Sequence, residues 1–252
     1  YDVYLRDTNG DLVADPIFGG SQYDYGSLTA RRAWNGTNGI ADAQYDLSQT
    51  DGTPILGNFN LSAAISKDFA FETRYSGQYQ NFENADRNNQ FYGGWAEAGG
   101  LLSISHDKRI NQNFLQLLRF NKSFGKHGVE AFVAHESTDY SRTVFSASAS
   151  KAIMPNTLDL TQYTTPFGRA NSYTQGYTLE SYFGQVNYNF DQKYYVTASA
   201  RRDGSSRFIN NKWGTFGSVG LGWIISREDF LVNSNSVNYM KLKASYGLIG
   251  DQ

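Results

Sequence analysis

The chain has 252 residues, a formal net charge of −2 and no cysteine. The lack of cysteine excludes disulfide scaffolds and thiolate metal sites, and the absence of a basic block makes nucleic acid a poor candidate partner. Aromatic residues make up 15% of the chain, which favours strands. No apolar run of about 18 residues occurs, so helical membrane spans are excluded. A mean hydropathy of −0.53 is compatible with a β-barrel, because only alternate barrel-strand residues are apolar.

The first part of the chain, residues 1–56, shows little periodicity and is rich in Gly, Asp, Asn and Thr. This composition predicts a loop region with short hairpins. The chain starts at Tyr1, without an initiator Met, and stops directly after a strand-like run. We therefore expect both ends to be cut from a longer protein, so that targeting signals would lie elsewhere.

One segment of this region resembles the start of a calcium-binding loop. Its oxygen-bearing side chains fall at positions 1, 3, 5 and 9 of the EF-hand pattern, and they are Asp7, Asn9, Asp11 and Asp15. Leu12 stands where the pattern needs glycine, and Phe18 stands where the bidentate Glu belongs. Calcium is the one cofactor that the sequence suggests, and a polar β-turn without metal is the favoured alternative.

Period-2 alternation starts at Gly57 and recurs to the end of the chain. Residues 57–252 are therefore predicted to form about eight strands of roughly ten residues each, enough to cross a bilayer at a tilt. Short and long connections mostly alternate. The short ones lie near Lys67, Gly125 and Asp191, and the long ones start from Asn81, Ser141 and Gly204. This pattern predicts an all-β fold: part of a transmembrane antiparallel β-barrel, with short periplasmic turns and long extracellular loops.

The hairpin over residues 180–208 carries the clearest alternation. One face is polar, and the other is apolar with aromatic residues toward the turn. An apolar face with aromatic ends is expected to meet lipid and its interface. The predicted lipid-facing and girdle residues are Tyr182, Val186, Tyr188, Phe190, Tyr194, Val196, Val219, Leu221 and Trp223.

The same region carries a family resemblance. The runs YFGQVNYNFDQKYYVTASARRDGSSRF, KWGTFGSVGLGWIISREDFL and LKASYGLIGDQ resemble the middle-to-late barrel of SusC/RagA-type TonB-dependent outer-membrane transporters of Bacteroidetes. The most specific parts are ARRDGSSRF and WGTFGSVGLGW, and the resemblance covers about residues 180–252. Upstream, the runs NFNLSAAISKDFAFETRYSGQY and FNKSFGKHGVEAFVAHES resemble the family more loosely, and residues 1–56 match it only weakly.

This resemblance implies a 22-stranded barrel in the outer membrane, with a plug domain and a TonB box near the N-terminus of the whole protein. Neither the plug nor the TonB box is present in this chain. The implied partners are TonB, acting through that absent region, a SusD-like surface lipoprotein, outer-membrane lipid, and a glycan or peptide ligand.

A charged segment follows the hairpin's second strand and comprises Arg201, Arg202, Asp203 and Arg207. Arginine suits bidentate contacts with carboxylates, so these residues could contact substrate or the plug. The alternative, which we favour, is an ion-pair network that holds the strand end. Arg202 falls on the nominal lipid side and is expected beyond the hydrocarbon layer.

Three classes of function remain open from the sequence. The first is a segment of an active importer of glycans or peptides, and the second is a structural or adhesive barrel in a larger surface complex. The third is an enzyme or a lectin-like domain, but no GxSxG elbow is present and the three His residues lack metal-ligand spacing. We therefore expect no enzymatic activity.

Overall fold

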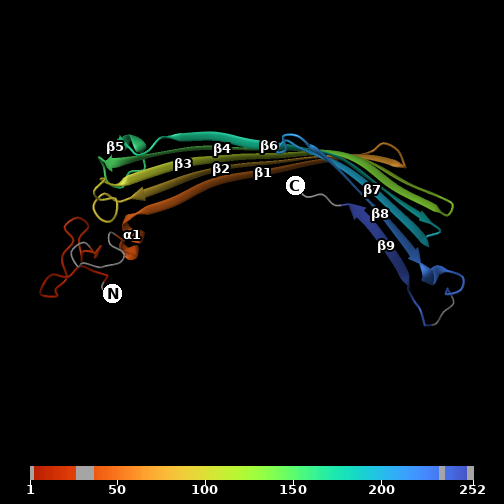
Figure 1. The fold of residues 1–252 in the computed structure, drawn as a ribbon, viewed down its shortest axis with the longest axis horizontal. Helices are drawn as coiled ribbons and strands as arrows, with labels where there is room; N and C mark the ends of the chain where they lie inside the picture. Colours follow the sequence, from red (N-terminus) through yellow and green to blue (C-terminus); the bar gives the residue numbers. More distant parts are fainter. Residues whose placement is uncertain (1–2, 27–36, 233–235, 249–252) are drawn as a thin grey trace. The chain divides into compact units, whose positions relative to one another are not determined.

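The computed structural model of the protein describes residues 3–26, 37–232 and 236–248. Its strands form one nine-stranded sheet in the order β1-β2-β3-β4-β6-β7-β8-β9, with β5 paired to β4 (Figure 1). The strands are β1 (Leu47–Ala64), β2 (Phe69–Asn88), β3 (Leu101–Phe124), β4 (His127–Ala152), β5 (Tyr163–Pro166), β6 (Asn171–Phe190), β7 (Tyr194–Ser205), β8 (Trp213–Ile224) and β9 (Lys241–Leu248). The helices are α1 (Gly39–Tyr45) and the 3-10 turns η1 (Leu160–Gln162) and η2 (Ile225–Arg227). In the part of the chain that the structure describes, no helix is long and apolar enough to cross a bilayer.

The chain divides into two compact units. Unit 1 comprises Tyr1–Pro54, Gln80–Lys108 and Arg142–Thr174, and unit 2 comprises Ile55–Tyr79, Arg109–Ser141 and Gln175–Gln252. The predicted boundary at residue 56/57 does not mark where strand structure starts, because β1 already begins at Leu47.

Unit 1 contains α1, a short helix fixed by its cap. The Asn38 side chain accepts hydrogen bonds from the backbone N–H groups of Ile40 and Ala41, which satisfies donors that a helix start leaves free. The helix buries Ala41 and Tyr45 against Tyr25. Isolated β-bridges fold the preceding segment into short hairpins, and they join Tyr4 to Tyr23, Arg6 to Leu12 and Ala14 to Ser21.

The long strands extend well beyond the ten residues expected for each. Strand β4 has 26 residues and β2 has 20, and both run into stretches expected to be irregular. These extensions escaped the alternation pattern because neither of their faces is consistently apolar. In unit 1, side-chain hydrogen bonds join neighbouring strands there instead, as from Thr50 to Asn84 (2.8 Å) and from Asn84 to Ser105 (3.1 Å).

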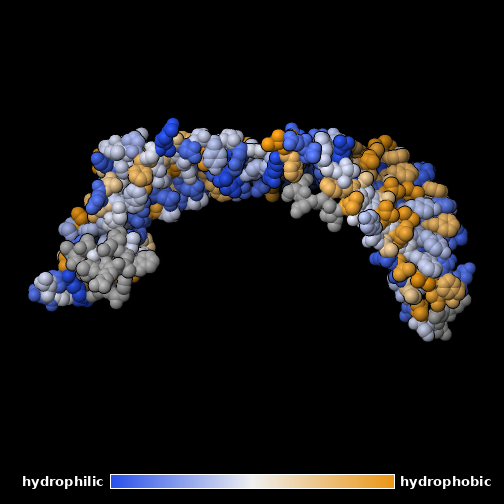
Figure 2. Space-filling model, in the orientation of Figure 1, coloured by the Kyte–Doolittle hydropathy of each residue, from blue (hydrophilic) through white to orange (hydrophobic). Residues whose placement is uncertain are grey.

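Unit 2 contains β7, β8, β9 and most of β6, and these antiparallel strands pair in a regular register. The β6–β7 connection is a tight turn with positive φ at Asp191 (55°) and Gln192 (52°), as short hairpin turns between twisted strands require. Large apolar side chains remain exposed on alternate positions of these strands. Figure 2 shows hydrophobic side chains gathered over β7, β8 and β9. This single-layer sheet therefore has an apolar face that none of the described residues of unit 2 covers.

Candidate functional site

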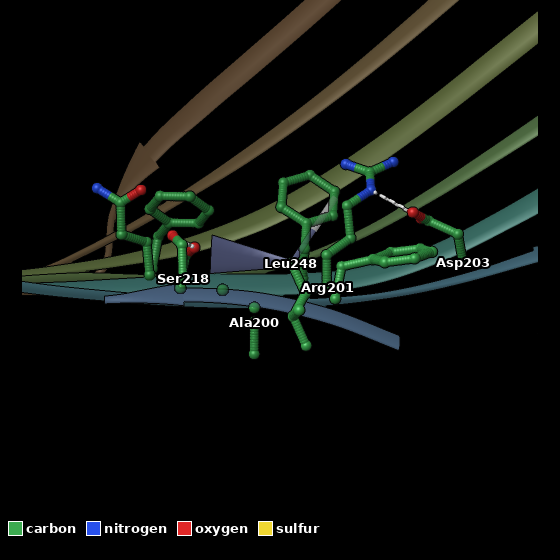
Figure 3. Close-up of a pocket in the computed structure, with 12 residues that line it drawn as sticks. Ala200, Arg201, Asp203, Ser218 and Leu248 are labelled. Atoms are coloured by element: carbon green, nitrogen blue, oxygen red, sulfur yellow. Dashed lines mark hydrogen bonds and ion pairs between the residues drawn. The ribbon is translucent and has the colours of Figure 1, made fainter. Parts of the chain in front are cut away.

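The polar face of β6, β7 and β8 carries a pocket of about 480 Å³. Its polar lining comes from Gln185, Ser199, Arg201, Asp203 and Ser218. In Figure 3, Arg201, Asp203 and Ser218 project to one side of the strands and Ala200 projects to the other. Strand alternation explains this arrangement, since residues two apart along a strand share a face.

Arg201 is the centre of this site. Its Nε donates to both carboxylate oxygens of Asp203, at 2.7 and 2.8 Å, and its second terminal nitrogen donates to the Ser181 hydroxyl at 3.0 Å. The Glu136 carboxylate lies 3.7 Å from the same nitrogen. The Asp203 side chain is 11% exposed and that of Arg201 is 42% exposed, so the pair is half-sheltered with the guanidinium still open to the pocket.

The Phe183 ring stacks against the Arg201 guanidinium. Phe183 is the register partner of Arg201 on β6, and the Arg201 Cζ atom lies 4.6 Å from the ring centroid. A planar guanidinium stacked on a ring and held by a carboxylate has little freedom to turn. The site therefore presents a fixed cation, suited to a carboxylate or to the hydroxyl oxygens of a polar ligand.

Hydroxyl and amide groups continue the polar face toward the β6–β7 turn. The Ser199 and Ser218 hydroxyls lie 2.6 Å apart. Closer to the turn, Asn187 accepts from the Thr197 hydroxyl and from the Gln185 amide, both at 3.0 Å. This uncharged hydrogen-bonding surface can be wetted along its length, as a barrel lumen requires.

The predicted charged segment is only partly brought together. Arg201 and Asp203 meet, whereas Arg202 stacks over the Trp213 ring at 5.2 Å and Arg207 over the Tyr177 ring at 3.7 Å. Arg202 points to the opposite face because it follows Arg201 on the same strand. The segment is therefore a carboxylate-held arginine plus two arginines held by aromatic rings.

The predicted lipid-facing residues form cross-strand rows on the apolar face. Tyr188 pairs with Val196, and Val196 pairs with Leu221. The next row joins Val186 to Val219 through Ala198. At the turn end the aromatic row consists of Phe190, Tyr194 and Trp223, whose neighbouring ring centroids are 6.4 Å apart. Tyr182 lies near the middle of β6 (Asn171–Phe190), away from this aromatic row.

Glu228 holds the aromatic row at the turn end. It accepts hydrogen bonds from the Tyr194 hydroxyl (2.6 Å) and the Trp223 ring nitrogen (2.8 Å), and it pairs with Lys193 at 3.5 Å. These hydrogen bonds, that of Tyr194 first, hold the pKa of Glu228 below its ordinary value. The sequence pattern did not single out Glu228, because it lies in a connection without periodicity.

The predicted calcium-loop residues have separate roles in unit 1. The Asp7 carboxylate accepts from the backbone N–H groups of Asn9 (2.8 Å) and Asp11 (3.0 Å) and so closes a turn. Asp15 accepts from the Tyr92 and Tyr45 hydroxyls, at 2.8 and 3.3 Å. Within residues 3–26, 37–232 and 236–248, no group of three or more His, Cys, Asp or Glu could hold a metal ion.

Asp15 has an altered acidity that follows from these contacts. Burial alone would raise its pKa, but backbone hydrogen bonds from Phe18 and Ile17 and hydroxyl bonds from Tyr92 and Tyr45 outweigh it. The net result is a pKa below the ordinary value. Burial, together with the Asp15 charge, raises the pKa of Tyr45 to about 12.

The sequence did not identify the residues that contact Arg201 from other strands, because strand pairing brings them there. Ser181 and Phe183 reach Arg201 from β6, and Glu136 reaches it from β4. Alternation could place Glu136 on the interior face, but only strand register brings it near Arg201.

No family model matches the chain. It is 33% identical over 148 residues to the TonB-dependent receptor SusC of Bacteroides thetaiotaomicron, which covers 57% of this chain and 14% of that protein. It is 25% identical over 232 residues to the TonB-dependent receptor P26 of Formosa agariphila, which covers 86% of this chain and 22% of that protein. The chain therefore spans less than a quarter of the length of these curated relatives.

A solved structure extends the likeness to the fold. "Structure of the RagAB peptide transporter" superposes with a TM-score of 0.77 at 21% identity, covering 95% of this chain and 26% of that chain. The fold is accordingly that of part of a transmembrane antiparallel β-barrel. The chain supplies eight consecutively paired strands of such a barrel, which agrees with the predicted number of about eight. The short strand β5 pairs with β4 as a ninth.

Proposed function

We propose that this chain, which is similar in sequence and fold to the barrel region of SusC/RagA-type TonB-dependent receptors, is a wall segment of an outer-membrane active importer of glycans or peptides. The observation that supports this proposal is the division of β6–β8 into a polar face around Arg201 and an apolar face around Val219. A barrel wall needs one face for the lumen and one for lipid. Transport then depends on the shape and polarity of a pore, so no covalent chemistry is assigned to these residues.

The partners follow from the same proposal. A SusD-like surface lipoprotein would cover the extracellular ends, and TonB would act through an N-terminal region outside this chain. The solved neighbour is named as a peptide importer in "closed-closed" and "open-open" states, which makes a peptide a reasonable first ligand to test. Arg201, which is held by Asp203 and open to the pocket, would meet the carboxylates of a peptide or the hydroxyls of a glycan.

The assignment of faces can be tested by thiol labelling, because this chain contains no cysteine. Ser218 and Val219 are neighbours on β8 with opposite facing. In the full-length protein in a bilayer, Ser218→Cys is expected to react with a water-soluble maleimide and Val219→Cys is expected to be protected. Equal labelling of both positions in the bilayer, with both variants folded, would reject the wall assignment.

Import itself is tested by uptake in cells that carry the full-length protein. Labelled oligopeptides and labelled oligosaccharides would be supplied separately, with and without TonB. We expect uptake of one class to disappear when TonB is removed. Uptake that persists without TonB contradicts an active importer. A strain without the protein that shows normal uptake of both classes but altered surface assembly favours the structural or adhesive alternative.

A further inference from the structure

A groove of about 630 Å³ lies along β4, β6 and β7 of unit 2. Strand alternation places its outward-facing side chains on the face opposite the Arg201 side chain. Its outward lining consists of Val133, Tyr182, Gly184, Val186, Ala198 and Ala200. It is hollow because Gly184 pairs with Ala200 and Ala200 pairs with Gly217, so no side chain larger than a methyl group rises from this row on three strands. The Tyr182 and Val133 side chains, which are 49% and 62% exposed, form the sides of the groove around this row of small residues.

One end of this groove carries an unpaired cation. Arg202 lines the groove and is the register partner of Tyr182 and Thr215. Its guanidinium rests on the Trp213 ring, at 5.2 Å from the centroid. Among the described residues, no carboxylate forms an ion pair with Arg202, whereas Arg201 on the other face has two acidic neighbours. The exposed guanidinium therefore retains its full capacity to bind an anion.

The other polar groups at this end lie close to one another, although the His135 Nε2 atom makes no hydrogen bond within the described part of the chain. His135 stacks on Tyr182 at 4.8 Å and lies 2.8 Å from the Gln116 side-chain oxygen through Nδ1 and 3.4 Å from Glu180 through Nε2. The Tyr182 hydroxyl donates to Glu180 at 2.5 Å. The Glu180 carboxylate accepts this hydrogen bond, and a neighbouring hollow is lined by Glu180, Asp139 and Lys212, so it adds no net positive charge.

The position of Arg202 along the strands identifies the layer it would meet. The row of Tyr182, Arg202 and Thr215 lies eight residues from the aromatic row of Phe190, Tyr194 and Trp223 on each strand (190 − 182, 202 − 194, 223 − 215). At about 3.3 Å per residue and a tilt of about 40°, this is roughly 20 Å, close to the apolar band of an outer-membrane barrel. Every outward position between the rows is apolar or glycine: Gly184, Val186, Tyr188, Val196, Ala198, Ala200, Gly217, Val219 and Leu221.

We propose that this groove binds a phosphorylated lipid of the outer leaflet, with an acyl chain in the groove and the phosphate on Arg202. An acyl chain fits an apolar channel floored by glycine and alanine, and Arg is suited to phosphate. A ring-backed guanidinium at the rim of the apolar band is placed where lipid phosphates begin. This proposal rests on the proposed outer-membrane location but not on import, because the groove faces away from the polar pocket.

The test uses the full-length protein, purified from its membrane in mild detergent and analysed by native mass spectrometry with added dimyristoyl phosphatidic acid. Arg202→Gln is expected to lower the bound lipid about tenfold, the size expected for losing a charge-assisted contact to phosphate. Ala200→Leu fills the groove but keeps the cation, and a similar fall is expected. Arg207→Gln is the matched control, because Arg207 also stacks on an aromatic ring, that of Tyr177. Tyr177 is an odd number of residues from Tyr182 on β6, so its ring lies on the opposite face of the sheet.

Each outcome decides the proposal. Lipid binding unchanged in Arg202→Gln overturns it, and so does a loss of equal size in Arg207→Gln. Inorganic phosphate that competes as well as the lipid reduces the site to an anion site and overturns the acyl-chain assignment. A second protein cross-linked over Ala200 in the membrane, with lipid excluded, also overturns it. Peptide and glycan uptake, measured on Ala200→Leu, is expected to stay at the unmodified level. If Ala200→Leu binds less lipid while uptake stays normal, the lipid site is supported independently of import. If lipid binding is intact but the protein shows no TonB-dependent uptake, only the proposed import function is contradicted.

Discussion

Unit 1 and unit 2 obtain their stability in different ways. Nine of the twelve buried apolar residues among those described belong to unit 1, including Tyr25, Tyr45 and Leu102. Unit 2 has only Leu117, Ala134 and Ile224, yet it exposes many large side chains such as Val219, Leu221 and Tyr246. Unit 1 therefore contains small cores typical of a protein in water, whereas unit 2 needs an apolar medium outside the chain to cover its face.

The strongest test of this contrast is loss of a large side chain in each unit. Tyr45→Ala removes a ring that stacks on Phe18 at 4.2 Å and bonds to Asp15, so it is expected to cost about 3–5 kcal/mol of unit 1 stability. Tyr246→Ala removes a ring that is 78% exposed and is expected to cost less than about 1 kcal/mol in detergent. Hydrogen exchange of the full-length protein measures both. Equal losses would contradict the difference between the units.

A charge on the apolar face of unit 2 tests the external medium directly. Val219 lies on β8 midway between Trp223 of the aromatic row and Thr215 of the Arg202 row, so Val219→Arg is expected to cost about 2–4 kcal/mol in folding into a bilayer. Ser218→Arg introduces the same charge on the polar face and is expected to fold nearly as well as the unmodified protein. Folding yield into phosphatidylcholine vesicles compares them. The contrast fails if Ser218→Arg is the more damaging change.

The acid sensitivity of unit 1 is expected to depend on Asp15. The pKa of Asp15 is lowered in the folded protein, so its stabilisation is complete above the unfolded value of about 3.9 and is lost as the pH falls through the folded value. Asp15→Asn is expected to lower unit 1 stability by about 1–2 kcal/mol at pH 7 and to flatten its pH dependence below about pH 4. Amide exchange of residues 3–26 between pH 3 and pH 7 provides the measurement. An unchanged pH profile in Asp15→Asn would assign the effect to another group.

The smallest effect is expected at an exposed ion pair of unit 2. Lys126 contacts Asp191 at 3.0 Å, but its side chain is 65% exposed. Water screens such pairs, so Lys126→Ala is expected to change stability by less than about 0.5 kcal/mol. Urea unfolding of the full-length protein in vesicles checks this value. A loss above about 1 kcal/mol would mean that this turn contributes more to unit 2 than surface electrostatics allows.

Some elements could be predicted from sequence because their signal is local. Alternation on β6, β7 and β8 assigns each residue to a face without any knowledge of the neighbours. The extensions of β2 and β4 carry no such signal, since neither of their faces is consistently apolar and only the hydrogen-bonded pairing of strands reveals them. Helix α1 was missed for a similar reason. Seven residues are too few for a helical period, and its cap at Asn38 lies within a Gly-, Asn- and Thr-rich stretch that looks like loop.

The sequence by itself determined the strand-rich fold, the two faces of the hairpin and the family resemblance, because each depends on residues close together along the chain. Only the tertiary structure decided which side chains meet. It held Arg201 between Asp203, Ser181 and Glu136 from different strands, and it left Arg202 on a tryptophan ring with no acidic partner among the described residues. It also aligned Gly184, Ala200 and Gly217 into one groove. Strand register determines these side-chain contacts, and register depends on pairing between segments that are distant in sequence.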